Sequence, residues 1–347
     1  PEKEMIWPRD WAASPFPEEP GTIYCTGYNA SVSQRTGDDV LGRAWVYRGT
    51  STFDTFDVTL DGSNRLPVAR NVTLRVYYPK GYSGAAPLIL VSHGGDGSEG
   101  DRGHTRLPHL GTEYARSGYV AVHLSHLPSG SNAQHRLDRP SDVSFVLDEL
   151  MNGMVTFPES FHGTIDFTRI GHVGHSWGAY TAHAVGGGQF DQGNLGDPRI
   201  KAIGLFSPQG PGGFGAYDTG PSDNTWRSIT IPTCSCVGAV EKDGSYGGGN
   251  SMEDWRLYPF MRYSTFSDHY LSVLPGQDHG DIGGSGSPEV QAFLAENSRV
   301  FFDVYLKAQT EKVSNIGQLA FFSGTLNSRK FDSIEGLPAG RFLSPGS

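Results

Sequence analysis

The sequence predicts a doubly wound α/β fold, with a mostly parallel sheet and helices on both of its faces. The first indication is a series of short, wholly apolar runs, which suit the strands of a sheet that is covered on both sides, and such sheets are mostly parallel. The second is the series of helical patterns between these runs, since strand–helix alternation is typical of the α/β class. The runs are PLILVSH (87–93), YVAVHLSH (119–126), RIGHVGH (169–175), KAIGLFSP (201–208), PTCSCVGA (232–239) and HYLSVLPG (269–276).

An antiparallel hairpin is expected before the parallel strands. The segments FDVTL (56–60) and NVTLRVYYP (71–79) alternate apolar and polar residues, which is typical of strands with one exposed face. Helices are expected at PHLGTEYARSG (108–118), PSDVSFVLDELMNG (140–153), the segment after Ser176, SMEDWRLYPFMRY (251–263) and SPEVQAFLAENSRVFFDVYLKA (287–308). The last of these begins with Ser-Pro and spaces its apolar residues by three and four, as an amphipathic helix does.

The chain divides into three expected segments. Residues 1–55 are irregular and rich in Pro, Gly and Asp, but their scattered aromatic residues indicate an arm packed on the domain. Residues 56–310 hold the alternating strands and helices and are expected to form a single catalytic domain. Residues 311–347 show no strong periodicity and are expected to form a C-terminal tail.

Composition excludes some classes of partner. The 347 residues carry a formal net charge of −10 and have a pI of about 5.6. Such an acidic balance argues against a broad nucleic-acid interface. No apolar run approaches the ~20 residues of a membrane-spanning helix. We therefore expect neither nucleic-acid binding nor a membrane span, and the oligomeric state stays open.

Three cysteines, Cys25, Cys234 and Cys236, are too few for a disulfide framework. Cys234 and Cys236 stand two apart in an expected strand, so both face one side, and buried thiols are the favoured interpretation. A disulfide from Cys25 to one of them stays open as an alternative. Because the chain begins at Pro1, we expect that a segment was removed, either a targeting peptide or an expression tag. A cleaved secretory signal favours a periplasmic or secreted location.

The stretch Gly174-His175-Ser176-Trp177-Gly178 matches the pattern G-x-S-x-G, which alone is a weak signal in a chain with 47 glycines. Its context strengthens it, because the serine follows an apolar strand and precedes a helical segment of small residues. This strand–turn–helix setting is the nucleophile elbow of a serine hydrolase. In so tight a turn, side chains at 174 and 178 would collide with the neighbouring strand and helix. We therefore predict that Ser176 is a nucleophile.

A serine nucleophile needs a base, and the base needs an acid that orients it. His279 follows the last apolar strand, which is where this architecture supplies the base. The loop after the preceding strand offers Glu241 and Asp243. Glu241 is preferred because it stands three residues past Gly238, where that strand ends, and Asp243 is the runner-up. Asp278 is a weaker third candidate, because its side chain is expected to point away from the ring of the adjacent histidine.

Two backbone N–H groups are expected to bind the oxyanion of the reaction. The segment VSHGGDGS (91–98) follows the strand before the first helix of the α/β alternation, where one donor originates in this architecture. Gly95 is the candidate there, and the residue after the nucleophile, Trp177, supplies the other. The indole of Trp177 either forms a wall of the substrate pocket or packs within the helix.

Two clusters of Asp and His residues do not predict a metal site. The segments DGSEGDRGH (96–104) and DHGDIGG (278–284) lack both the alternating oxygen ligands of a calcium loop and a helical pair of histidines. We therefore expect no metal and no cofactor.

As an ordered set, the motifs of residues 75–307 resemble those of the α/β-hydrolases. More narrowly, they are similar to bacterial dienelactone-hydrolase-like and platelet-activating-factor-acetylhydrolase-like serine esterases, a group close to cutinases and polyester hydrolases. The resemblance is carried by PLILVSHGGDG, ARSGYVAVHLSH, RPSDVSFVLDEL, RIGHVGHSWGAYTA, DPRIKAIGLFSP, IPTCSCVGAVEKD and YLSVLPGQDHG.

This resemblance implies the same catalytic residues. The family's nucleophile falls on Ser176 and its base on His279. Its acid, nine residues after the proline that opens the strand, falls on Glu241, although the family normally has aspartate there. True dienelactone hydrolases use a cysteine nucleophile, so the resemblance does not imply their substrate.

The expected function is the hydrolysis of carboxylic esters by a Ser-His-acid triad, with a small-molecule or polymeric ester as substrate. Fold and triad do not choose the leaving group, so an amidase or peptidase is the alternative enzyme. A non-catalytic binding protein on a hydrolase scaffold is the alternative outside enzymes. The segments 153–163, 209–227 and 244–256 are expected to shape the mouth of the site.

Overall fold

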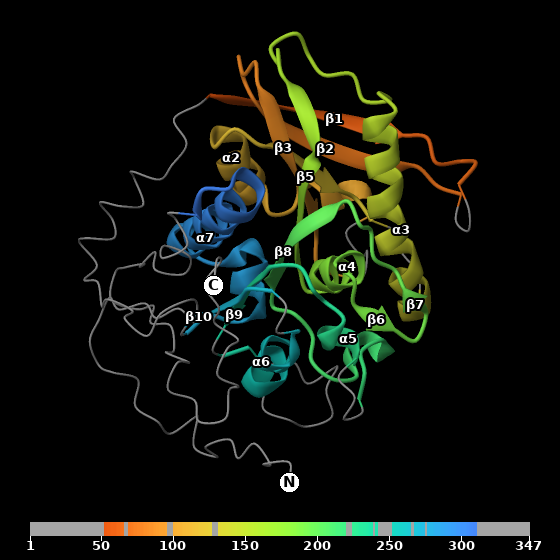
Figure 1. Ribbon diagram of the computed structural model, residues 1–347, viewed down its shortest axis with the longest axis vertical. Coiled ribbons are helices and arrows are strands. Elements are labelled where there is room, and N and C mark those ends of the chain that lie inside the picture. Colours follow the sequence, from red (N-terminus) through yellow and green to blue (C-terminus); the bar gives the residue numbers. More distant parts are fainter. Residues whose placement is uncertain are drawn as a thin grey trace, which may run out of the picture.

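Figure 1 shows the computed structural model of the chain, which describes residues 52–65, 69–95, 100–126, 131–219, 224–238, 240–241, 252–264, 267–274 and 276–310. The expected tail and almost all of the expected arm lie outside these residues, as do Cys25 and Asp243. The first strand begins at Phe53, three residues before the expected start of the domain at residue 56.

The predicted sheet is confirmed. Its strands are β1 (Phe53–Leu60), β2 (Val72–Pro79), β3 (Ala85–Ser92), β4 (Val120–Leu124), β5 (Thr164–His175), β8 (Ile200–Phe206), β9 (Thr233–Gly238) and β10 (His269–Leu274). They lie in the order β1-β2-β4-β3-β5-β8-β9-β10. The hairpin strands β1 and β2 are antiparallel to each other, and β2 is antiparallel to β4. All the pairings from β4 to β10 are parallel. A separate small ribbon pairs β6 (Gln189–Phe190) with β7 (Gly193–Asn194).

The sheet separates two hydrophobic cores, because successive side chains of a strand point to opposite faces. In β3, Leu88 and Leu90 belong to one core, while Ile89 and Val91 belong to the other. All four side chains are buried. An apolar residue at every position is therefore what a strand in the middle of this sheet requires, which explains the continuous apolar runs.

Helices cover both faces, as expected for a doubly wound fold. The helices are α2 (Pro108–Arg116), α3 (Asn132–Met151), α4 (Trp177–Val185), α5 (Asn224–Arg227), α6 (Met252–Arg262) and α7 (Pro288–Lys307), with shorter turns at Gly100–Thr105, Gly213–Gly215 and Asp281–Ser285. In Figure 1, α2 and α7 pack together on one face, and α3 and α4 lie on the other. In α7, the Ser287 hydroxyl accepts from the N–H of Val290, so the predicted Ser-Pro start is confirmed.

Helix α3 begins eight residues before its expected start at Pro140. A proline lacks the N–H that would bond the carbonyl four residues earlier, so it suits the first turn of a helix better than the interior. In the structure that carbonyl belongs to Arg136, and the hydroxyl of Tyr180 in α4 donates to it at 2.8 Å. A tertiary hydrogen bond thus replaces the missing helical one and lets α3 continue through the proline.

The cysteines of β9 are buried in the core, as expected. The side-chain amide of Asn297 donates to both sulfur atoms, Cys234 Sγ and Cys236 Sγ, at 3.5 Å, so the two side chains face the same side of the strand. Neither forms a disulfide with a described residue. Within the described ranges, no helix is both long enough and apolar enough to cross a bilayer.

Candidate active site

Ser176 stands on a sharp turn between β5 and α4. Its backbone has φ 54° and ψ −114°, a conformation that non-glycine residues rarely adopt and that stores strain. The N–H of Ser176 donates to the carbonyl of Phe206 at the end of the neighbouring strand β8. The turn thereby holds the serine at the carboxyl edge of the sheet, where ligands bind in doubly wound folds.

The two glycines that flank Ser176 are required by close backbone contacts. A Cβ atom on Gly174 would lie 2.2 Å from the carbonyl oxygen of Gly178, at the start of α4. A Cβ atom on Gly178 would lie 2.0 Å from the carbonyl oxygen of Ser92 in β3. The predicted collisions with the helix and with a neighbouring strand are therefore confirmed.

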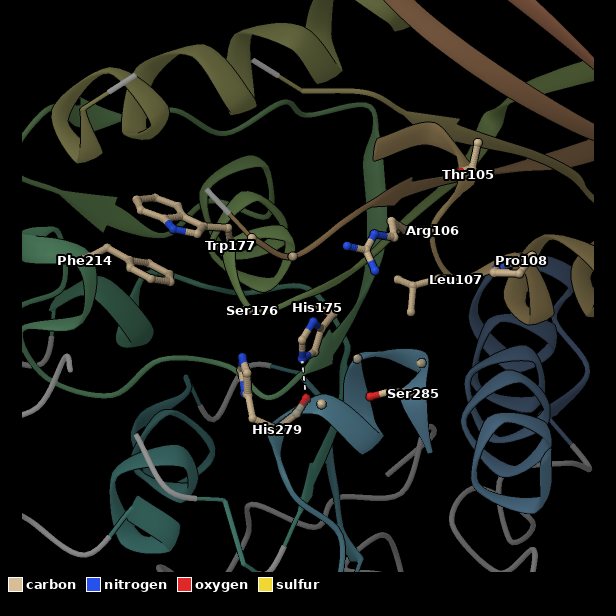
Figure 2. Close-up of a pocket in the computed structure, with 15 residues that line it drawn as sticks. Thr105, Arg106, Leu107, Pro108, His175, Ser176, Trp177, Phe214, His279 and Ser285 are labelled. Carbon is tan, nitrogen blue, oxygen red and sulfur yellow. Dashed lines mark hydrogen bonds between the residues drawn. The ribbon is translucent and has the colours of Figure 1, made fainter. Parts of the chain in front are cut away.

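A cavity of about 600 Å³ opens at this edge, a size within the usual range of small-molecule sites. Figure 2 shows Ser176 and the ring of His279 at this cavity. Its lining consists of Gly94, Gly95, Thr105, Arg106, Leu107, Pro108, His175, Ser176, Trp177, Phe214, His279, Gly280, Gly283, Gly284 and Ser285. The predicted nucleophile, base and two oxyanion donors thus line one cavity, although they come from three separate parts of the chain.

Of the candidate acids, Glu241 lies against His279. The Nδ1 atom of His279 is 3.0 Å from Oε2 of Glu241. Since Nδ1 faces the carboxylate, the other ring nitrogen, Nε2, faces away from it. Asp243 lies outside the described residues. Asp278 has a different role, because its Oδ1 accepts from the N–H of Asp281 and caps the short turn after the histidine.

The carboxylate of Glu241 is completely buried and bonded on both oxygens. Oε1 accepts from the hydroxyl of Ser207 at 2.6 Å and from the N–H of Gly238 at 2.7 Å. Oε2 faces His279 and the guanidinium of Arg256, whose Nε lies at 3.0 Å. Burial raises the pKa of Glu241, but the contacts with His279, Arg256 and Ser207 outweigh it and hold that pKa below its usual value. The carboxylate is therefore ionised at neutral pH.

Arg256 is a member of the site that the sequence did not indicate. It comes from α6 and is only 1% exposed. Besides contacting Glu241, its Nη1 donates to the carbonyls of Ser207 and Pro208, and its Nη2 lies 3.3 Å from Nδ1 of His279. Arg256 therefore joins the loops that follow β8 and β9 to the predicted base. An arginine within a helix carries no motif, so only its position in space reveals it.

His175, the variable residue of G-x-S-x-G, supports the loop of the base. Its Nε2 donates to the backbone carbonyl of His279 at 3.0 Å, as the dashed line in Figure 2 marks. The two imidazole rings lie with their centroids 4.5 Å apart. Burial, with the charge of a protonated His279 second, holds the pKa of His175 well below its usual value, so His175 stays neutral.

Both candidate oxyanion donors line the cavity. Trp177 is the first residue of α4, and the first N–H groups of a helix have no acceptor within it. The positive end of the helix dipole also favours negative charge at this place. Gly95 lies in the loop after β3, with φ 82°.

An aromatic pair forms one wall of the cavity. The rings of Trp177 and Phe214 stack with their centroids 3.6 Å apart and an angle of 9° between their planes. Phe214 comes from the segment 209–227, one of the three that were expected to shape the mouth. The indole thus lines the cavity and also packs within its helix, where its ring centroid lies 5.5 Å from that of Tyr180.

The expectation for the segment 153–163 was wrong. None of its residues lines the cavity; Phe157 and Phe161 instead pack against Tyr78 of β2. This segment leads from α3 into the start of β5, so it lies at the amino edge of the sheet. The nucleophile stands at the other end of the same strand. Of the segment 244–256, only residues 252–256 are described, and none of them lines the cavity.

A second Ser-His-Asp arrangement lies beneath the loop after β3. The Oγ atom of Ser92 is 2.7 Å from Nε2 of His126, and Nδ1 of His126 is 2.8 Å from Oδ2 of Asp142. These three side chains are at most 1% exposed and do not line the cavity. Asp142 also pairs with Arg65 and Arg70. The acid–histidine contact of Glu241 with His279 therefore has a buried counterpart in Asp142 and His126, and of the two serines Ser176 lines the cavity while Ser92 does not.

Among the described residues, no group of three or more His, Cys, Asp or Glu side chains is arranged to hold a metal ion. Comparison of the chain with protein-family models gives no match, and comparison with curated proteins gives none either. The assignment of function therefore depends on the geometry of the site.

Proposed function

We propose that the protein is a serine hydrolase of the α/β-hydrolase superfamily that cleaves carboxylic esters through an acyl-enzyme. The observation that carries the proposal is the contact of the buried Glu241 carboxylate with Nδ1 of His279, at a cavity that Ser176 also lines. The strained backbone of Ser176 supports it, because such strain concentrates at functional sites. The motif resemblance to dienelactone-hydrolase-like and platelet-activating-factor-acetylhydrolase-like esterases points the same way.

In the proposed reaction, Oγ of Ser176 attacks the ester carbonyl while Nε2 of His279 takes the hydroxyl proton. Glu241 accepts the N–H of Nδ1 and stabilises the imidazolium that forms. The N–H groups of Gly95 and Trp177 bind the oxyanion of the tetrahedral intermediate. When the intermediate collapses, the bond to the alcohol oxygen breaks and the imidazolium protonates that oxygen. A water molecule then repeats these steps on the acyl-enzyme and releases the acid and free Ser176.

A fluorophosphonate probe tests the proposal, because it phosphonylates activated serines. We expect labelling of the wild type and none of Ser176→Ala, with the adduct mapped by mass spectrometry to the peptide that contains Ser176. An adduct on Ser92 would assign the chemistry to the other Ser-His-Asp arrangement. The absence of any adduct would favour a binding protein on a hydrolase scaffold.

The leaving group and chain length are tested with p-nitrophenyl esters from acetate to palmitate and with matching p-nitroanilides. We expect the short esters to be the better substrates, because the cavity is bounded by the stacked Trp177 and Phe214 rings on one side. Faster cleavage of the anilides would replace the esterase by an amidase. A preference for the longest chains would contradict a site for short esters.

A further inference from the structure

The loop that carries Gly95 is held by buried side chains on three consecutive carbonyls. Nη1 of Arg139 donates to the carbonyl of His93 at 2.9 Å, and Nη2 donates to the carbonyl of Gly95 at 2.8 Å. The carbonyl between them, that of Gly94, lies 2.7 Å from Nδ1 of His93. Arg139 is fully buried and His93 is 2% exposed. This short loop is therefore fixed from within the protein.

The hydrogen bonds of His93 define which of its nitrogens carries the proton. The backbone N–H of His126 points at Nε2 of His93 at 3.1 Å, and a backbone N–H can only donate. Nε2 is thus the acceptor, so the proton of the neutral ring is on Nδ1 and is donated to the carbonyl of Gly94. Burial, with the charge of Arg139 second, holds the pKa of His93 well below its usual value, which is consistent with a neutral ring.

These bonds determine the direction of the N–H of Gly95. In a planar trans peptide, the N–H of one residue points opposite to the carbonyl of the residue before it. The carbonyl of Gly94 is directed at the ring of His93, so the N–H of Gly95 is directed away from that ring. Gly94 lies against the nucleophile, since a Cβ atom on it would be 3.2 Å from Cβ of Ser176. Both glycines line the cavity.

Arg139 also faces the residue that supplies the other candidate donor. Its guanidinium carbon lies 5.8 Å from the ring centroid of Trp177, at the distance of a cation–π contact. The helix that carries Arg139 is tied to α4 by the hydrogen bond from Tyr180 to the carbonyl of Arg136. One side chain of α3 therefore contacts both sides of the candidate oxyanion hole.

We propose that Arg139 and His93 are positioning residues that hold the Gly94–Gly95 peptide with its N–H toward the oxyanion. This inference rests on the proposed serine-hydrolase function. Neither residue contacts the substrate; both act through the backbone. A preset donor is worth more in catalysis than one that must reorient, because no reorganisation is needed as the charge develops.

The experiment compares Arg139→Met and Arg139→Lys with the wild type on p-nitrophenyl acetate, with active sites counted by fluorophosphonate labelling. Removal of an oxyanion donor typically lowers kcat by about 10²–10³-fold, so loss of a residue that only orients the donor is expected to cost about 10–100-fold. KM is expected to change by less than about twofold, because the ground-state carbonyl gains little from these donors. Arg139→Lys should be intermediate, since lysine keeps the charge but cannot bridge two carbonyls with one planar group.

The matched control is Arg299→Lys, at a buried arginine of α7 that pairs with Glu113, Glu296 and Asp303 away from the cavity. It is expected to lower the melting temperature while kcat per labelled site stays at the wild-type value. Affinity for an alkylboronic acid, which forms a tetrahedral adduct with the serine, should fall in Arg139→Met and not in Arg299→Lys. Unchanged kcat per site and unchanged boronate affinity in Arg139→Met would overturn the inference.

Hydrogen–deuterium exchange of the peptide that spans residues 93–95 tests the holding role without any catalysis. Exchange is expected to be faster in Arg139→Met than in the wild type or in Arg299→Lys, and equal exchange in all three proteins would contradict the role. A wild type that neither labels nor hydrolyses esters would refute the proposed function instead, while the exchange result would still decide whether Arg139 fixes this loop.

Discussion

At the scale of single residues, Glu241 shows how charge and hydrogen bonding define the site. Oε1 is occupied by two donors, Ser207 and Gly238, and Oε2 faces two more, His279 and Arg256. A carboxylate suits this position because it only accepts hydrogen bonds. These partners come from the loops after β8 and β10, from the last residue of β9 and from α6.

Glu241→Gln is expected to remove most of the activity. With the amide oxygen bonded to Ser207 and Gly238, the NH₂ group of glutamine would face the donors of Arg256 and His279, so it could neither orient nor stabilise the imidazolium. For a serine protease, loss of this charge lowers kcat by roughly 10⁴-fold, and a comparable loss is expected here. Steady-state kinetics on p-nitrophenyl acetate measure it.

Asp243→Asn is the matched control for this prediction, since it removes the runner-up carboxylate. Its kcat is expected to stay within about twofold of the wild-type value, because Asp243 is not a member of the proposed triad. If Asp243→Asn abolished activity while Glu241→Gln retained it, the acid would have been assigned to the wrong residue of this loop.

At the scale of secondary-structure elements, the packing of α3 against α4 gives a buried polar group of one helix a hydrogen-bond partner on the other. Helix α3 passes through Pro140, and Tyr180 donates to the carbonyl of Arg136 that the proline leaves without a helical donor. This continuation brings Arg139 to the loop after β3. A helix that began at Pro140 would not include Arg139 in a regular turn.

At this scale we predict that substitutions at Tyr180 and Pro140 have coupled, non-additive effects on the free energy of unfolding. Tyr180→Phe leaves the carbonyl of Arg136 without that donor, and the expected loss in the free energy of unfolding is about 1–3 kcal/mol. In Pro140→Ala, residue 140 regains an N–H that can donate to this carbonyl, so Tyr180→Phe should cost less in that background. Urea denaturation of the four proteins of the cycle measures the coupling, and strictly additive effects would disprove it.

At the scale of the whole molecule, buried histidines make the fold sensitive to acid. Burial lowers the pKa of His172, His183 and His123 to about 3 and that of His109 to about 4. In the unfolded chain a histidine titrates near 6.5. Between these values the unfolded state binds more protons than the native state, so stability falls as the pH falls below about 6.5.

Each of these histidines is expected to remove up to about 1.4 kcal/mol of stability per pH unit over this window. Urea midpoints measured from pH 7.5 to pH 4.5 should therefore decrease steadily below about pH 6.5. His109→Phe is the control, because the ring nitrogens of His109 make no hydrogen bond within the described residues and its titration can be removed alone. Its stability should depend less steeply on pH than that of the wild type. Equal midpoints at pH 7.5 and pH 5 would contradict this account.

The sequence by itself determined the strands, most of the helices and the place of Ser176, because these are local signals. A short apolar run bounded by turn residues predicts a buried strand, and the G-x-S-x-G pattern predicts a tight turn, although this turn also contacts the distant Ser92 and Phe206. The order of the motifs also led to His279 and Glu241, which the structure brings within 3.0 Å of each other at the predicted edge. Their catalytic roles stay a prediction.

Only the tertiary structure decided which further side chains surround the site. Arg256 lies in a helix outside the motifs, Arg139 begins the segment RPSDVSFVLDEL but had no role predicted from it, and each reaches a loop far from it in sequence. The start of α3 depended on a hydroxyl from another helix, and the position of 153–163 depended on which end of β5 it enters. The physical reason is common to all these cases: a buried polar group must find a partner in space, and local sequence does not specify a partner that is distant along the chain.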